Sequence, residues 1–308
     1  MTRIERTLGA CLAALALFAA VCAAEPAAKP PTGATVTLYT TADLHEHSEP
    51  LVRIAGYVKR HKAKDPNTLF LDAGDFLNKG EKALAATEGE GMVAIMTAAG
   101  YDACALGNHD YMYSRNRIFA LVATFPGFRL TLGNCRWHPT DRARAKAIPR
   151  YRIFALKGVK VAVIGMACQI MNNAPDPQVP AYSQAEALRE LVPVLRSKAD
   201  IIVATTHQGD ADDLDLIKVA GANAPDVLVG SHSHRRFVRR VGKTLFIKAG
   251  FYGNHLGKVT VTWDGRRITS CKGTVIPVGR DWPEDAKTKA VRARYVTPAQ
   301  AGPKKKAA

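Results

Sequence analysis

Five short polar segments are spread along most of this chain, and each follows a short apolar run. In chain order they are Asp43-Leu44-His45, Gly74-Asp75, Gly107-Asn108-His109-Asp110, His207 and Gly230-Ser231-His232-Ser233-His234. Short apolar runs are typical of buried strands. Because ligands of an open α/β sheet bind outside the carboxyl ends of its strands, these segments can meet only at such an edge. The spacing therefore predicts a parallel sheet that gathers distant side chains into one site.

Predicted strands and helices alternate through the first two thirds of the sequence, which favours an α/β fold. Strands are predicted over 36–41, 68–72, 102–106, 151–156, 159–165, 201–205 and 227–230, with a further extended segment at 128–132. Helices are predicted over 51–61, 81–99, 116–125, 183–198 and 213–220. The apolar runs at 237–241, 245–248, 258–263 and 267–275 predict further, antiparallel strands. We therefore expect two packed β-sheets flanked by helices. From Gly279 onward the sequence is polar and is expected at the periphery.

Residues 1–24 have the features of a signal peptide. A basic start with Arg3 and Arg6 is followed by an apolar run from Leu8 to Val21 and by small residues before Glu25. The run is shorter than the roughly 20 residues that a membrane-spanning helix needs. We therefore expect export, most simply to a bacterial periplasm. A lipid anchor at Cys11 or Cys22 is the alternative.

The rest of the chain is expected to hold one domain at 35–278, after a linker at 25–34 and before a polar, lysine-rich tail at 279–308. The formal net charge of +16 favours anionic partners, here a small phosphorylated substrate. Lysines 304–306 are typical of a solvated chain end, so no specific nucleic-acid binding is predicted. Cys104 and Cys135 can form a disulfide in an oxidising compartment or remain buried thiols. The oligomeric state is not predicted.

The residue types in the five segments are ligands for divalent metals. The candidates are Asp43, His45, Asp75, Asn108, His207, His232 and His234. A carboxylate has two oxygens and can bridge two cations, so Asp75 is the predicted bridge. Two divalent cations outweigh two carboxylates and one hydroxide by a single positive charge, and such a site attracts a phosphate ester. Two metals also lower the pKa of a bridging water and hold the attacking and leaving oxygens.

These segments resemble the calcineurin-like metallophosphoesterase superfamily, and in particular its 5′-nucleotidase and UDP-sugar hydrolase type of catalytic domain. The resemblance runs from Val36 to Val275 and includes Thr-Ala-Asp-Leu-His, Leu-Asp-Ala-Gly-Asp, Thr-His-Gln-Gly and Gly-Ser-His-Ser-His. It implies a four-layer αββα sandwich. It also implies that one metal is held by Asp43, His45, Asp75 and His234, and the other by Asp75, Asn108, His207 and His232.

The resemblance further implies that His109 is the acid that protonates the leaving group. The nucleotidase branch has an Asp three residues later to orient it, where this chain has Met112. The adjacent Asp110 is therefore the candidate catalytic partner. Asn108 and Arg235 are the candidates for substrate binding, although Arg235 and Arg236 can equally be a solvated pair. The segment 253–255 repeats part of the catalytic triplet and is expected to be a turn.

About thirty residues follow Val275, too few for the domain that holds the nucleobase in two-domain nucleotidases. Nucleotide specificity is therefore not implied. The sequence predicts an exported phosphoesterase that hydrolyses phosphate mono- or diesters by attack of a hydroxide bridging two divalent metals, which can be Mn, Fe or Zn. Two alternatives stay open: a SoxB-like sulfur-ester hydrolase on the same scaffold, and a non-catalytic, metal-containing module that binds anions.

Overall fold

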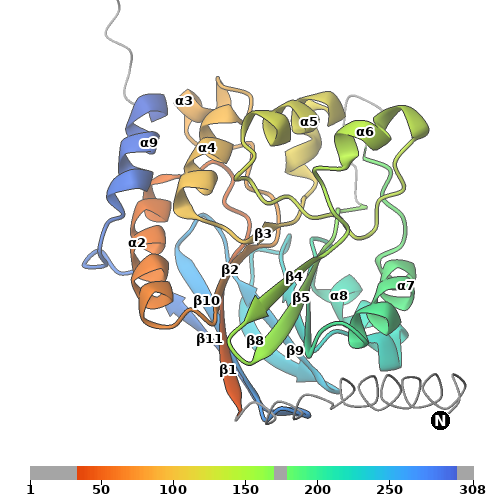
Figure 1. Ribbon diagram of the computed structural model, residues 1–308. Helices are drawn as coiled ribbons and strands as arrows, with labels where there is room; N and C mark the ends of the chain where they lie inside the picture. The colour runs from red at the N-terminus through yellow and green to blue at the C-terminus, as the bar shows by residue number, and fades with distance from the viewer. Residues whose placement is uncertain (1–32, 170–178, 297–308) are drawn as a thin grey trace, which may run out of the picture. The chain divides into compact units, whose positions relative to one another are not determined.

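Two β-sheets pack against each other in the computed structural model, which describes residues 33–169 and 179–296 (Figure 1). The predicted signal peptide and residues 304–306 lie outside the described residues. In the first sheet the strand order is β11-β10-β1-β2-β3. Its strands are β1 (Ala34–Thr41), β2 (Thr68–Asp72), β3 (Ala103–Cys104), β10 (His255–Trp263) and β11 (Ile268–Pro277). Strands β1, β2 and β3 are parallel, and β10 and β11 are antiparallel additions.

The second sheet has the strand order β4-β5-β6-β7-β9-β8. Its strands are β4 (Arg152–Leu156), β5 (Val159–Gly165), β6 (Ile201–Thr205), β7 (Val227–Gly230), β8 (Arg236–Val241) and β9 (Thr244–Ala249). The four central strands run parallel, while β4 and β8 pair antiparallel at the two edges. Each sheet therefore has a parallel part whose carboxyl ends can carry a site.

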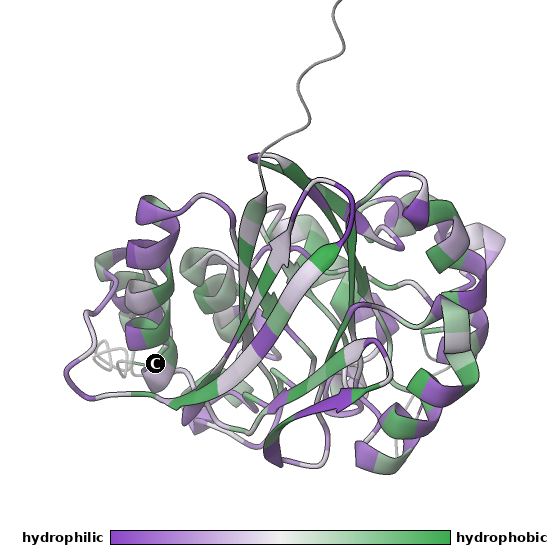
Figure 2. Cartoon of the chain, turned by 90° about the horizontal axis from the view of Figure 1, so that it is seen from below, coloured by the Kyte–Doolittle hydropathy of each residue, from purple (hydrophilic) through white to green (hydrophobic). Residues whose placement is uncertain are grey.

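Successive side chains of the central strands lie alternately in two hydrophobic cores, one between the sheets and one under the helices. In β5, Val161 and Val163 lie in the core between the sheets, whereas Ala162 and Ile164 lie in the core under the helices. Successive side chains of a strand point to opposite faces, so a strand covered on both sides is apolar at nearly every position. Figure 2 shows the strands between two groups of helices whose outward surfaces carry polar residues.

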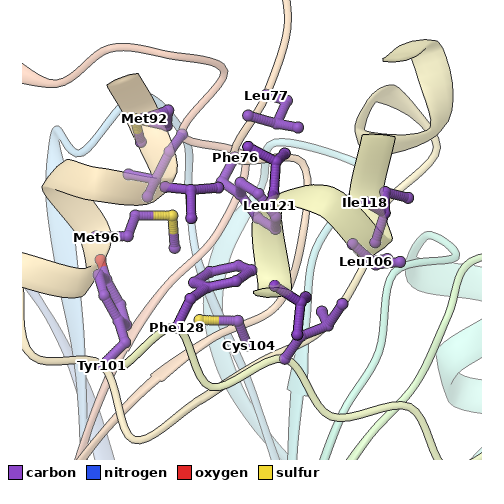
Figure 3. Close-up of a cluster of buried hydrophobic side chains, with 14 of the residues drawn as sticks. Phe76, Leu77, Met92, Met96, Tyr101, Cys104, Leu106, Ile118, Leu121 and Phe128 are labelled. Atoms are coloured by element: carbon purple, nitrogen blue, oxygen red, sulfur yellow. The ribbon is translucent and has the colours of Figure 1, made fainter. Parts of the chain in front are cut away.

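Helices cover the outer face of each sheet. The elements on the side of the first sheet are α2 (Glu49–Lys64), α3 (Lys82–Ala85), α4 (Glu90–Ala99), η1 (His109–Tyr113), α5 (Arg115–Thr124), η2 (Pro139–Asp141), α6 (Arg142–Ala145) and α9 (Ala286–Val296). Those on the second sheet are α7 (Gln184–Arg196), α8 (Asp210–Ala220) and η3 (Gly221–Asn223). In Figure 3, Met92 and Met96 of α4 and Leu121 of α5 point into one buried cluster with Phe128 and Cys104.

The expected α/β fold with two packed sheets and flanking helices is confirmed. Three local expectations differ from the structure. Strand β3 has two residues instead of five, and the predicted extended segment 128–132 contributes only an isolated bridge between Leu130 and Cys104. The polar region after Gly279 contains the helix α9, which packs on α2 and α4.

The chemistry of α9 explains why its sequence looks peripheral. Its contacts to the body of the protein are both apolar and polar. Val291, Tyr295 and Val296 pack against the core, and Arg292 donates hydrogen bonds to Ser48 Oγ at 2.8 Å and Glu81 Oε2 at 2.6 Å. Because α9 combines a few apolar contacts with charged ones, its sequence shows no clear apolar stripe.

Cys104 and Cys135 are separate buried thiols and form no disulfide with each other. Across residues 33–169 and 179–296, no helix combines the length and apolar character that crossing a bilayer requires.

Candidate metal centre

The five polar segments lie together at the carboxyl ends of parallel strands from both sheets. Asp43 follows β1, Asp75 follows β2, and Asn108 follows β3 after a short loop. His207 follows β6 and His232 follows β7. Asp75 Oδ2 and His207 Nε2, from different sheets, are 3.0 Å apart. The packing of the two sheets thus joins two rows of side chains into one site.

The candidate ligands form two clusters. The first cluster consists of Asp43, His45 and His234. The Nε2 atom of His234 lies 3.2 Å from His45 Nε2 and 3.6 Å from Asp43 Oδ1. Asp75, His207 and His232 form the second. In each cluster the ligand atoms lie within 4.8 Å of one another. Carboxylate and imidazole groups converging in this way suit a divalent cation.

Asp75 lies between the two clusters. Its Oδ2 is 3.0 Å from His207 Nε2 and 3.7 Å from His45 Nε2, so one carboxylate faces both. Asn108 completes the second cluster, because its Oδ1 is 3.0 Å from His232 Nδ1. All seven predicted ligands therefore lie close together, and Asp75 faces both clusters.

Five of the seven candidate ligands have a positive φ. The values are 50° for Asp43, 46° for His45, 57° for Asp75, 76° for His232 and 56° for His234. A left-handed backbone costs a non-glycine residue about 1–2 kcal/mol, and such residues cluster at functional sites. At the end of each strand the chain turns sharply here, which points the side chain into the site rather than along the sheet.

Two glycines allow the loops after β2 and β3 to touch. A Cβ on Gly74, which has φ +94°, would lie 2.5 Å from Gly107 N. A Cβ on Gly107 would lie 2.0 Å from Asp75 Oδ1. The small residue before Asp75 thus serves the contact between two loops, and this contact fixes the carboxylate.

His207 has the hydrogen bonding expected of a metal-binding histidine. Its Nδ1 is 2.6 Å from Ser231 Oγ and 3.1 Å from Ala73 O. A proton on Nδ1 donated to these oxygens leaves the lone pair of Nε2 directed at Asp75. The Nε2 atom is buried and has no hydrogen-bond partner among the described residues. An orphaned nitrogen beside a carboxylate fits a bound cation.

Behind the ligands lies a buried ammonium group that the sequence did not single out. Lys248 on β9 is 1% exposed, and its Nζ donates to Ser231 O at 2.7 Å and Ser233 Oγ at 3.1 Å. The same Nζ is 2.8 Å from Asp210 Oδ1 and 3.3 Å from Asp213 Oδ2. One cation therefore holds the loop that carries His232 and His234 against the start of α8.

Electrostatics favour a cation at the inner cluster. Burial lowers the pKa of His207, but the Asp75 carboxylate beside it raises that pKa to about 9. Burial raises the pKa of Asp75, but His207 and His45 lower it to about 2. Burial raises the pKa of Asp43 to about 7. Asp75 thus stabilises a positive charge at the point where a metal ion would replace the proton of His207.

His109 lies at the rim of the site. Its ring centroid is 4.8 Å from that of His45, and its backbone N–H donates to Asp75 Oδ1 at 2.8 Å. Burial lowers the pKa of its imidazole. Its Nδ1 is buried and has no hydrogen-bond partner among the residues that the structure describes.

Asp110 has a different place from the one expected. Instead of turning toward His109, its fully buried carboxylate accepts three backbone hydrogen bonds, from Asp75 at 2.9 Å, Leu77 at 2.9 Å and Gly107 at 2.7 Å. These bonds occupy both oxygens. Asp110 therefore joins the loops after β2 and β3 and positions Asp75, which corrects the expectation of a direct catalytic role.

Arg235 and two residues of the segment 253–255, Asn254 and His255, border a cavity next to His234. Arg235 is largely exposed, and its Nη1 lies 3.2 Å from Asp210 Oδ2. Asn254 and His255, expected in a plain turn, line the cavity too, and His255 is the first residue of β10. The turn expectation is wrong for His255.

Comparison with known proteins agrees with this geometry. The calcineurin-like phosphoesterase family matches residues 36–236, well over half of the sequence. The chain belongs to this family. The calcineurin-like phosphoesterases use divalent metals, so the family and the two clusters together support a metal-dependent phosphoester hydrolase.

Similar proteins come from several bacteria. An uncharacterised metallophosphoesterase of Bacillus subtilis, YunD, is 28% identical over 270 residues, which cover 82% of this chain and 56% of that protein. The crystal structure of a 5′-nucleotidase precursor from Thermus thermophilus has a TM-score of 0.73 at 25% identity, over 86% of this chain and 59% of that one. The chain thus spans little more than half of either.

A third comparison shows the fold alone. The sulfate thiohydrolase SoxB of Thermus thermophilus has a TM-score of 0.73 at 19% identity, over 88% of this chain and 62% of that one. The calcineurin-like scaffold is therefore shared by proteins with different names, and the scaffold does not decide which bond is cleaved.

Proposed function

We propose that this chain is an exported hydrolase of small phosphate mono- or diesters that works with two divalent metal ions. One observation carries the proposal: Asp75 lies between two clusters of ligands drawn from both sheets, with an oxygen 3.0 Å from His207 and 3.7 Å from His45. A site for a single metal has no use for a carboxylate in this position. Two-metal sites of this kind serve in-line displacement at phosphorus.

In this proposal, Asp43, His45 and His234 hold one ion, Asn108, His207 and His232 hold the other, and Asp75 is shared. The ions supply a water-derived nucleophile at neutral pH and positive charge for the phosphate oxygens. Manganese, iron and zinc all suit such mixed ligands.

In the same proposal, Asn108, His109 and Arg235 interact with the ester. The side-chain amide of Asn108 can donate a hydrogen bond to a phosphate oxygen while its Oδ1 faces the ions. His109, at the rim beside His45, is placed to give a proton to the departing oxygen. A general acid contributes roughly 10²–10⁴-fold to a rate. Arg235 lies at the same rim and adds positive charge toward an anionic ester.

A panel of esters tests the proposal. Purified protein loaded with Mn²⁺, and separately with Zn²⁺, is assayed with phenyl phosphate, bis(4-nitrophenyl) phosphate and a nucleoside monophosphate, with metal content measured on the same samples. Turnover of at least one ester that is lost with a chelator and restored by metal is expected. A folded, metal-loaded sample with no turnover on any ester rejects the proposal.

Two arms of the same panel address the other functions. Release of sulfate from a cysteine S-sulfonate peptide, without hydrolysis of phosphate esters, would point to a sulfur-ester hydrolase. Binding of phosphate without turnover of any substrate would point to a non-catalytic anion-binding module.

Export is tested separately. The chain is expressed in full in a bacterium, and the periplasmic fraction is examined by mass spectrometry. A mature protein that begins at Glu25 is expected. A lipid-modified amino-terminal cysteine, or retention of residues 1–24 in the cytoplasm, would contradict it.

A further inference from the structure

A cavity of about 510 Å³ opens directly beside the candidate ligand His234. It is lined by His234, Arg235, Arg236, Phe251, Asn254 and His255. The Phe251 ring stacks on the His234 ring, with centroids 4.8 Å apart and planes at 18°. One wall of the cavity is therefore aromatic and the others are polar or cationic.

The two arginines of this cavity differ in how their charge is compensated. Arg235 lies 3.2 Å from Asp210 and is partly neutralised by it. Arg236 has no carboxylate at ion-pair distance within the described part of the chain. Its Nη1 instead lies 2.5 Å from His255 Nε2. Since an exposed guanidinium normally attracts an anion, Arg236 is a positive charge without a counter-charge.

His255 fixes Arg236 without cancelling its charge. A guanidinium can only donate hydrogen bonds, so Nε2 of His255 must accept and the ring proton must lie on Nδ1. Burial, followed by the nearby arginine charge, lowers the pKa of His255, so the ring is neutral at pH 7. The pair therefore presents one full positive charge and an additional N–H donor.

We propose that this cavity binds the leaving group of the substrate and that Arg236, held by His255, binds a second anionic group on it. The inference rests on the proposed function: with the scissile phosphate at the two ions, whatever lies beyond His234 is the remainder of the ester. The Phe251 ring accommodates an apolar or planar portion of that remainder. The substrate class is a phosphate ester with a carboxylate or a second phosphate on its leaving group.

Arg239 provides a matched control on the same strand. It is exposed like Arg236, but its guanidinium carbon lies 4.8 Å from the centroid of the Phe237 ring and it does not line the cavity. Arg236→Gln and Arg239→Gln therefore remove the same charge from β8 at two places. An effect of net charge alone is the same in both variants.

The test compares substrates that differ by one charge. The ratio of kcat/KM for 4-carboxyphenyl phosphate to that for phenyl phosphate, and the same ratio for hydroquinone bisphosphate, are measured for wild type and both variants. A lost charge-assisted hydrogen bond predicts that Arg236→Gln lowers at least one ratio about tenfold, while Arg239→Gln keeps the wild-type ratios. The ratio that falls tells whether a carboxylate or a phosphate is preferred.

A binding measurement separates this inference from the proposed hydrolysis. The affinities of 4-(phosphonomethyl)benzoate and benzylphosphonate, which cannot be hydrolysed, are measured by calorimetry with the Mn²⁺-loaded protein. Stronger binding of the benzoate, lost in Arg236→Gln and kept in Arg239→Gln, supports the subsite even if no ester is turned over. Equal binding of the two compounds by wild type, or equal losses in both variants, overturns it.

Discussion

On its inner side, around Asp43, Asp75 and His207, the candidate metal centre is almost completely enclosed, whereas on its outer side His109 and His234 meet solvent. His207 is 0% exposed, and the side chain of His234 is 37% exposed. The Nδ1 of His207 lies within hydrogen-bonding distance of Ser231 Oγ, while the Nδ1 of His109 has no partner among the described residues.

The difference in exposure indicates that the inner side suits metal binding and the outer side suits contact with substrate. A metal ion needs ligands whose orientation does not change, and the inner side provides them through buried hydrogen bonds and Lys248. An incoming ester needs groups that it can reach, and on the outer side His109 and His234 are partly exposed. The ring of His109 is only partly buried, which agrees with a role toward substrate.

The largest effect is expected for Asp75, because both clusters of ligands depend on its carboxylate. Asp75→Asn removes the carboxylate charge that faces both clusters, so metal should be lost from both and kcat/KM should fall about 10⁴-fold. Elemental analysis and phenyl phosphate kinetics measure the two effects. Asp212→Asn, an exposed position on α8, is the control and should match wild type. Retention of two metals with near-normal turnover would remove Asp75 from its proposed position.

The second largest effect is expected for His109 and distinguishes catalysis on the outer side from metal binding on the inner side. His109→Ala should lower kcat about 10²–10³-fold while metal content stays near the wild-type value, because its proposed task is proton transfer. His138→Ala, at an exposed histidine just before η2, serves as the control for loss of an imidazole. If His109→Ala instead loses metal, His109 is a ligand with His45 and Asp75, an arrangement that their spacing also permits.

Lys248→Met tests the buried support of the inner side. Removal of the ammonium leaves Asp210 and Asp213 without their counter-charge and frees the loop at Ser231. We expect about 3–5 kcal/mol lower free energy of unfolding and roughly 10–100-fold weaker Mn²⁺ binding. Denaturant unfolding and metal titration measure these.

Two further variants sharpen this result. Lys218→Met removes an exposed lysine paired with Asp215 and should change stability by no more than about 0.5 kcal/mol. Adding Asp213→Asn to Lys248→Met removes one uncompensated carboxylate and should recover part of the stability. If both lysine variants behave alike, burial of Lys248 has no energetic role.

The smallest predicted effect is the pH dependence of metal binding. Below their pKa values of about 9 and about 7, His207 and Asp43 carry protons that a cation must displace. On the outer side the pKa of His234 is lowered by burial, so this histidine has no proton to release near neutrality. Mn²⁺ binding should therefore release one proton between pH 7 and 9 and approach two below pH 7.

Each released proton makes the affinity rise about tenfold per pH unit. Calorimetry in buffers with different ionisation enthalpies counts the protons directly. Binding that releases no proton at pH 8 would show that His207 is already neutral in the metal-free protein.

Much of the fold was predictable from local patterns. Strands β2, β5, β6 and β7 have the predicted boundaries, because a strand buried on both faces is a short apolar run with polar residues at its end. The elements that were predicted with a different length, or not at all, are those whose stability is not local. The two-residue β3 depends on its neighbour β2, and α9 depends on tertiary contacts, such as the packing of Tyr295 and the hydrogen bonds of Arg292.

Which side chains could meet was predictable, because residue type and position after a strand are local properties. How each side chain is held depends on the packing of distant elements. Asp110 follows the candidate acid His109, and Lys248 stands between Ile247 and Ala249 in an apolar run, and the packing of both sheets buries the two side chains. Once buried, each must satisfy its charge with whatever backbone or side-chain groups the fold brings near, and no sequence pattern records that partner.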